Sequence, residues 1–174
     1  MEMKPYQQQV INELELILTP NLKEKWPQGY TTVMGNLGYS KMKKGIINYT
    51  DNYFKEALNL SVKNNFENNI VYEFLNLGEY YSIVKDTTSS IKYLNQSLQL
   101  AQKLKMGEQI KKSLQLLSQV DYKNATFYDK KYIANCNNID KSQIALTSYK
   151  ARVVSLTKLQ ATLKNSGNEI VNDQ

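Results

Sequence analysis

Asn36-Leu37-Gly38 and, further on, Ala57-Leu58-Asn59-Leu60 decide the fold, because the chain repeats both at the same distance. The first returns as Asn76-Leu77-Gly78 and the second as Ser97-Leu98-Gln99-Leu100, each displaced by 40 residues. Leu116-Leu117-Ser118 continues the first series after another 40 residues. A fixed period of this length is the sequence signature of a repeat architecture, in which each copy is one supersecondary unit.

Each copy contains two helical patterns, in which apolar residues recur at spacings of three and four. The 174 residues include only 7 Gly and 3 Pro, which suits long helices better than the many turns of a β protein. The spacing predicts helix pairs at 30–43 and 46–63, at 67–84 and 87–104, and at 107–119 and 122–134. The third pair requires a shortening of about five residues. A leading helix is expected from Pro5 to Leu18, and a last helix at 139–165.

Breaks between these helices are expected at Thr19-Pro20-Asn21, at Trp26-Pro27-Gln28-Gly29 and at residues 135–138. The expected organisation is therefore an N-terminal capping helix (1–27), three repeats, a C-terminal helix (135–165) and a flexible tail (166–174). The repeats occupy 28–134, divided into about 28–65, 66–106 and 107–134.

These copies resemble the tetratricopeptide repeat family, whose repeat is a helical hairpin with small residues at fixed places. The residues that carry the resemblance are Leu37-Gly38, Gly45, Phe54 and Ala57 in the first copy, and Phe74, Leu77-Gly78, Tyr81, Leu94 and Ser97 in the second. Because Gly38 and Gly78 carry no side chain, a second helix can pack against each of them.

Two departures from the family pattern stand out. Thr50 and Ser90 occupy positions that are usually alanine, and the proline that normally ends a repeat is absent after Leu60 and Leu100. The resemblance still implies an all-α fold: a right-handed superhelical solenoid of antiparallel helix hairpins, with extra N- and C-terminal helices.

Repeats of this kind are similar to the sensory or regulatory regions of bacterial signalling proteins, including peptide-responsive regulators. The resemblance implies a non-catalytic module that binds a peptide or protein on a concave face, lined by the first helix of each pair. The alternative is a structural or oligomerising element that forms a homodimer through the C-terminal helix. The heptad-like stripe of that helix fits a cap or a dimer interface, and comprises Leu146, Tyr149, Val153, Leu156 and Leu163.

The expected groove positions, counted along the first helices, are Asn36, Tyr39, Lys43, Tyr72, Asn76, Glu79, Lys111, Gln115 and Gln119, with Thr32 on the same face. Asn36 and Asn76 are equivalent, and an asparagine amide can both donate to and accept from a peptide backbone. The alternative is that both are ordinary solvated asparagines. Lys43 and Lys111 either capture a partner's carboxylate or are ordinary surface lysines.

The composition argues against catalysis. The chain has no histidine, which removes the usual general base and the commonest zinc ligand, and its one cysteine, Cys136, has no thiol partner. The glycines at 35, 38 and 45 are interpreted as packing and turn residues, and the glutamates, Glu73 and Glu79 included, as members of exposed helix faces. We therefore expect no enzyme, no metal and no other cofactor.

The net charge of +6 is spread along the chain, and only one arginine is present. Nucleic-acid readers favour arginine for bidentate contacts, so nucleic acid is not the expected partner. No apolar run approaches the roughly 20 residues that a membrane helix needs. We expect no membrane segment and, with a lone thiol, a cytoplasmic location.

Overall fold

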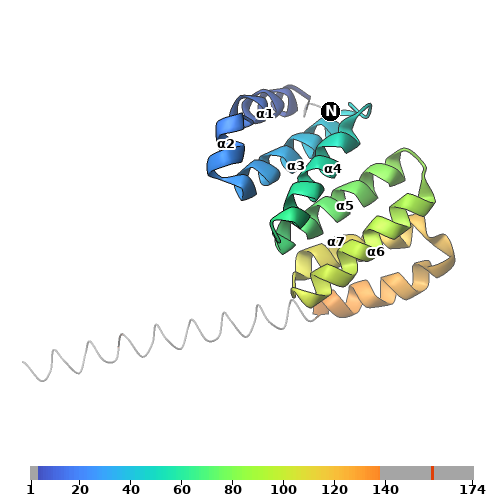
Figure 1. Ribbon diagram of the computed structural model, residues 1–174. Coiled ribbons are helices and arrows are strands. Elements are labelled where there is room, and N and C mark those ends of the chain that lie inside the picture. Colours follow the sequence, from blue (N-terminus) through green and yellow to red (C-terminus); the bar gives the residue numbers. More distant parts are fainter. Residues whose placement is uncertain (1–3, 138–157, 159–174) are drawn as a thin grey trace, which may run out of the picture. The chain divides into compact units, whose positions relative to one another are not determined.

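The computed structural model describes residues 4–137 and Lys158, and among these residues all regular structure is helical, with no strand (Figure 1). Two compact units divide the chain, Met1–Ile133 and Ala134–Gln174. The helices of the first unit are α1 (Lys4–Ile17), α2 (Pro20–Lys25), α3 (Pro27–Lys44), α4 (Thr50–Lys63), α5 (Glu67–Ile83), α6 (Thr87–Lys103) and α7 (Gly107–Val120). A short 3-10 turn, η1 (Tyr122–Asn124), leads into a helix over 125–137.

The expected repeat helices are present, and the first helices of the three copies begin at residues 27, 67 and 107, a strict 40-residue period. The first helix ends before Thr19 and the chain breaks at Trp26, as expected, but the structure differs from expectation in three details. Pro27 begins α3 instead of breaking the chain, because the N–H that proline lacks is unsatisfied in a first helical turn anyway. Thr19 caps the unforeseen helix α2, since its Oγ1 accepts from the Leu22 N–H at 3.2 Å. Residues 135–137 are helical, while the helix expected at 139–165, apart from Lys158, lies outside the described residues.

The turns between helices also recur at a fixed distance. Backbone φ is positive at Gly45, Asn65, Lys85 and Lys105, which stand 20 residues apart. In each turn two N–H groups bond back into the preceding helix; at Lys105, for example, they reach the Gln102 and Ala101 carbonyls at 3.2 and 2.9 Å. This Schellman arrangement satisfies carbonyls that a helix end leaves free. The series stops after α7, which agrees with the predicted shortening of the third copy.

Small residues let the two helices of a copy approach each other. A Cβ at Gly38 would lie 2.8 Å from Phe54 Cε1, and one at Gly78 would lie 2.6 Å from the Leu94 side chain. Ala57 and Ser97, on the second helices, are fully buried. The prediction that small residues at these four positions allow the helices to approach closely is confirmed.

The two hydroxyls that replace alanine are accommodated by hydrogen bonds. Thr50 Oγ1 donates to the Ile46 carbonyl at 2.5 Å, and Ser90 Oγ donates to the Gly78 carbonyl at 2.8 Å. Because both side chains are fully buried, these bonds remove the penalty that an unpaired hydroxyl would carry.

From α2 to α7 each helix packs against the next one along the chain, and α1 packs against α3. In addition α3 contacts α5, as α5 contacts α7 (Figure 1). The first helices of successive copies therefore lie beside one another. One face of α3, one of α5 and one of α7 can contribute side chains to a common surface, and the candidate site lies there.

Candidate functional site

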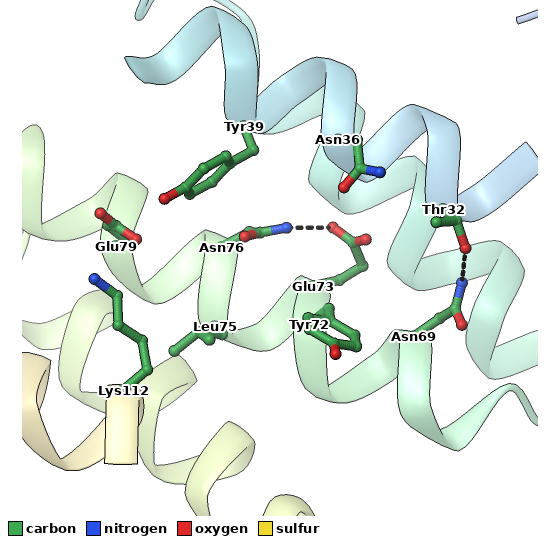
Figure 2. Close-up of a pocket in the computed structure, with 10 residues that line it drawn as sticks. All are labelled: Thr32, Asn36, Tyr39, Asn69, Tyr72, Glu73, Leu75, Asn76, Glu79 and Lys112. Carbon is green, nitrogen blue, oxygen red and sulfur yellow. Dashed lines mark hydrogen bonds between the residues drawn. The ribbon is translucent and has the colours of Figure 1, made fainter. Parts of the chain in front are cut away.

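A pocket of about 490 Å³ lies between α3, α5 and α7 (Figure 2). Its lining residues are Thr32, Asn36, Tyr39, Asn69, Tyr72, Glu73, Leu75, Asn76, Glu79 and Lys112. Most of these side chains are polar, and six of the ten come from α5, the central helix.

The 40-residue register organises this lining. Thr32, Tyr72 and Lys112 are equivalent positions of the three copies, and all three line the pocket. Asn36 and Asn76 are equivalent as well. The pocket is therefore lined by equivalent positions on the first helices of successive copies.

The structure brings together five of the nine expected groove residues, namely Asn36, Tyr39, Tyr72, Asn76 and Glu79. Their role in binding a partner stays a prediction.

The other four do not line the pocket. Lys43 stands beside it, with Nζ 2.5 Å from Glu79 Oε1 and 5.1 Å from the centre of the Tyr39 ring. Lys111 forms an ion pair with Glu108 at 3.0 Å, and Gln115 and Gln119 are exposed.

Glu73 is not on an exposed face, contrary to expectation. Its side chain lines the pocket, yet only 2 % of the residue is exposed. Oε2 accepts one hydrogen bond, from Asn76 Nδ2 at 3.3 Å (Figure 2). A Cβ at Gly35 would overlap the carboxylate, so this glycine of α3 leaves room for Glu73 instead of for a neighbouring helix.

Burial raises the pKa of Glu73 to about 8, and the hydrogen bond from Asn76 only partly opposes this shift. A carboxylate removed from water without a cation beside it is disfavoured, so the neutral acid persists at neutral pH. Such a strongly perturbed group in a pocket marks a candidate functional residue.

Glu79 was also expected on an exposed face, but only 7 % of it is exposed. Unlike Glu73 it has a cation, because Lys43 forms the ion pair described above. Burial alone would lower the pKa of Lys43, but the hydrogen bond and charge of Glu79, together with Tyr39, outweigh burial and raise it. The two buried glutamates of α5 therefore differ: one is paired and one is not.

Hydrogen bonds fix one end of the pocket. Asn69 Nδ2 lies 2.8 Å from Thr31 Oγ1 and 2.9 Å from Thr32 Oγ1, which ties α5 to α3. Gln109 of α7 donates to the Tyr72 hydroxyl at 2.9 Å. These contacts hold the lining side chains in place, which reduces the ordering that a ligand would have to impose.

Asn36 is exposed and makes no hydrogen bond with the described residues, and Asn76 uses one amide hydrogen on Glu73. A primary amide offers two donors and a carbonyl acceptor, so both side chains retain capacity for a ligand. Figure 2 shows Asn36 pointing from α3 toward α5, into the space beside Glu73. The arrangement can therefore hydrogen-bond an extended chain while a carboxyl group lies at the floor.

The sequence interpretation missed Asn69, Glu73, Leu75 and Lys112. A stricter use of the 40-residue register would have found two of them. Lys112 is the equivalent of Tyr72, whereas the expected Lys111 is one residue out of register. Glu73 is the equivalent of Val33 and Ser113, so an acidic residue replaces an apolar and a small one.

The described residues hold no group of three or more His, Cys, Asp or Glu side chains that could bind a metal ion. Within 4–137, no helix is both long and apolar enough to cross a lipid bilayer.

Comparison with known proteins adds no assignment to this geometry: no protein-family model matches the chain, and no curated protein matches it.

Proposed function

We propose that this chain is a non-catalytic, tetratricopeptide-like module that binds a peptide or an extended protein segment in the pocket between α3, α5 and α7. The observation that carries the proposal is the pair Asn36 and Asn76, which occupy equivalent places in two copies and both line the pocket.

The repeat geometry supports this proposal. A peptide in extended conformation presents its N–H and C=O groups at a regular spacing, and a regular series of amides suits such a ligand. Stacked helix hairpins would continue the surface as a right-handed solenoid, with the first helices on the concave side. A role as a sensory or regulatory region of a bacterial signalling protein in the cytoplasm belongs to the same proposal.

The lining also supplies contact area. Tyr39 and Tyr72 are partly exposed at the pocket, and a tyrosine ring buries a large apolar area while its hydroxyl stays hydrated. Each amide hydrogen bond to a ligand contributes about 1 kcal/mol. Recognition through the backbone would set the affinity, and the lining side chains would set the preference for sequence.

A displayed library of random peptides, selected on the native chain, tests the proposal directly. Affinities of the enriched peptides are then measured by fluorescence anisotropy on the double variant Asn36→Ala/Asn76→Ala. Loss of two hydrogen bonds predicts affinity weaker by roughly 30-fold.

The matched control is Asn59→Ala/Gln99→Ala. These two residues are also 40 residues apart and exposed, but they lie on the second helices, α4 and α6, outside the pocket lining. The control is expected to bind as the native chain does. Enriched peptides that bind the Asn36/Asn76 variant with native affinity, or a selection that enriches none, would contradict the proposal.

A further inference from the structure

One oxygen of Glu73 has no partner. Oε2 accepts from Asn76, but Oε1 accepts no hydrogen bond from any described residue. The absence of a side chain at Gly35 makes room for this oxygen, since a Cβ there would overlap it. Glu73 is therefore more than nine-tenths buried at the floor of the pocket, and one of its two carboxyl oxygens accepts no hydrogen bond from the described residues.

We propose that the pocket recognises a primary ammonium group of the bound segment, with Glu73 as its carboxylate partner. The group would come from a lysine side chain or from the free N-terminus of a peptide. This inference rests on the proposed function and specifies the chemistry of the ligand.

The acceptors around the pocket suit an ammonium better than a guanidinium. An ammonium has three donors directed outward from one nitrogen, and Glu73 Oε1 and the side-chain oxygens of Asn36 and Asn76 can meet them. A guanidinium binds a carboxylate best through two parallel hydrogen bonds, which need both of its oxygens. Because Asn76 already occupies Oε2, that geometry would require Asn76 to leave.

The charges that face Glu73 leave it without compensation. From α3 come Tyr39 and the nearby Lys43, whose charge is matched by Glu79 of α5. From α7 comes Lys112, whose ammonium points toward Glu79 in Figure 2. The described residues of α4 and α6 contribute nothing to the lining. Although the chain has a net charge of +6, the Glu73 carboxyl group at the floor of the pocket has no cation paired with it among the described residues, so a ligand's cation would be stabilised there.

The proton balance follows from this pairing. Without a ligand, Glu73 has a pKa of about 8 and is mostly a neutral acid below that pH. A bound ammonium favours the ionised carboxylate. Binding therefore releases a proton from Glu73 to solvent. For an ammonium that stays protonated over this range, affinity should rise roughly 20-fold between pH 6.5 and 8.5, following the fraction of ionised Glu73.

The two sources of the ammonium differ at higher pH. A lysine side chain keeps its proton until about pH 10, whereas a peptide α-amine loses it near pH 8. Affinity for a lysine should continue to rise to about pH 9, while affinity for an N-terminus should pass through a maximum near pH 8.

The first measurement uses a small probe that needs no peptide. Butylammonium chloride is titrated into the native chain against sodium chloride at equal ionic strength, and the side-chain amide signals of Asn36 and Asn76 are followed by NMR. We expect saturable shifts that strengthen from pH 6.5 to 8.5. Glu73→Gln should abolish them, and Glu67→Gln, an exposed glutamate on the same helix that pairs with Lys103 at 2.7 Å, should preserve them.

The second measurement uses the enriched peptides in three forms: free N-terminus without lysine, acetylated with lysine, and acetylated without lysine. One of the first two should bind at least 10-fold more tightly than the third, and Glu73→Gln should remove the difference. Circular dichroism confirms that each variant is folded.

The outcomes separate the two proposals. If all three peptide forms bind equally well, to the native chain and to Glu73→Gln alike, the ammonium site is overturned and peptide binding stands. Butylammonium shifts that depend on Glu73, with no peptide bound, would support the ammonium site and contradict the peptide-binding function. Absence of any effect of Glu73→Gln with either probe would overturn the inference.

Discussion

Replacing Glu73 by glutamine should stabilise the protein, and increasingly so as the pH rises. Glutamine has nearly the same shape and can still accept from Asn76, but it cannot ionise. In the native chain the pKa of Glu73 rises from its ordinary value of 4.5 to about 8 on folding. Between these two values the folded state holds a proton that the unfolded state has lost, so the stability of the native chain falls with increasing pH.

The magnitude follows from the size of this shift. Each pH unit between the two pKa values changes the free energy of unfolding by about 1.4 kcal/mol. At pH 7.5 the upper limit for Glu73→Gln is therefore a gain of about 4 kcal/mol. Because Glu73 borders a pocket that water can enter, we expect a gain of about 2 kcal/mol. Below pH 5 the gain should vanish, and above pH 8 it should stay constant.

Urea unfolding followed by circular dichroism, at pH 5.5, 6.5, 7.5 and 8.5, gives the required free energies. The difference in the free energy of unfolding between Glu73→Gln and the native chain isolates Glu73, because the contributions of all other titrating groups cancel. Glu67→Gln serves as control, since its ion pair with Lys103 is exposed and should contribute less than about 1 kcal/mol. Parallel curves for Glu73→Gln and the native chain would refute the reasoning, because they would mean that Glu73 ionises alike in both states.

Two further predictions concern stability and are checked by the same urea unfolding at pH 7. Ser61 is fully buried with an unpartnered Oγ, while its equivalent in the next copy is Ala101. Ser61→Ala should therefore gain about 1 kcal/mol, and a loss would show that the hydroxyl has a partner. Lys85 and Lys105 adopt φ of 64° and 58° in their turns. The equivalent of Lys85 in the first copy is Gly45, which also has a positive φ. Lys85→Gly and Lys105→Gly should each gain about 0.5–1 kcal/mol, Gly45→Ala should lose a similar amount, and the reverse order would contradict the turn geometry.

The helices could be predicted from the sequence because the information that sets them is local and repeated. Gly38 and Gly78 mark close approaches that only a residue without a side chain permits. The failures occurred where one residue type has two uses. Pro27 can end a helix or begin one, and only its environment decides between them.

The site could be predicted only in part, because a helical period fixes spacing but not rotation or depth. The 40-residue register predicted Asn36 and Asn76 on one common face, and both line the pocket. It could not show that Glu73 is buried, since glutamate on an amphipathic helix is usually solvated and its burial depends on α3 lying across it. Gly35, which makes that burial sterically allowed, is a contact from another copy, and nothing in its own neighbourhood indicates this role.

Glu73 and Gly35 together argue that this pocket is a functional feature and not only a consequence of stacked helices. The neighbouring copies carry Val33 and Ser113 at the position of Glu73, so the repeat does not require an acid there. An unpaired buried acid lowers stability at neutral pH, and a glycine inside a helix lowers it by about another 1 kcal/mol. Departures from the local rules of stability are expected at functional or strained sites. An ammonium group beside Glu73 would pair with this acid, and its binding would stabilise the folded chain.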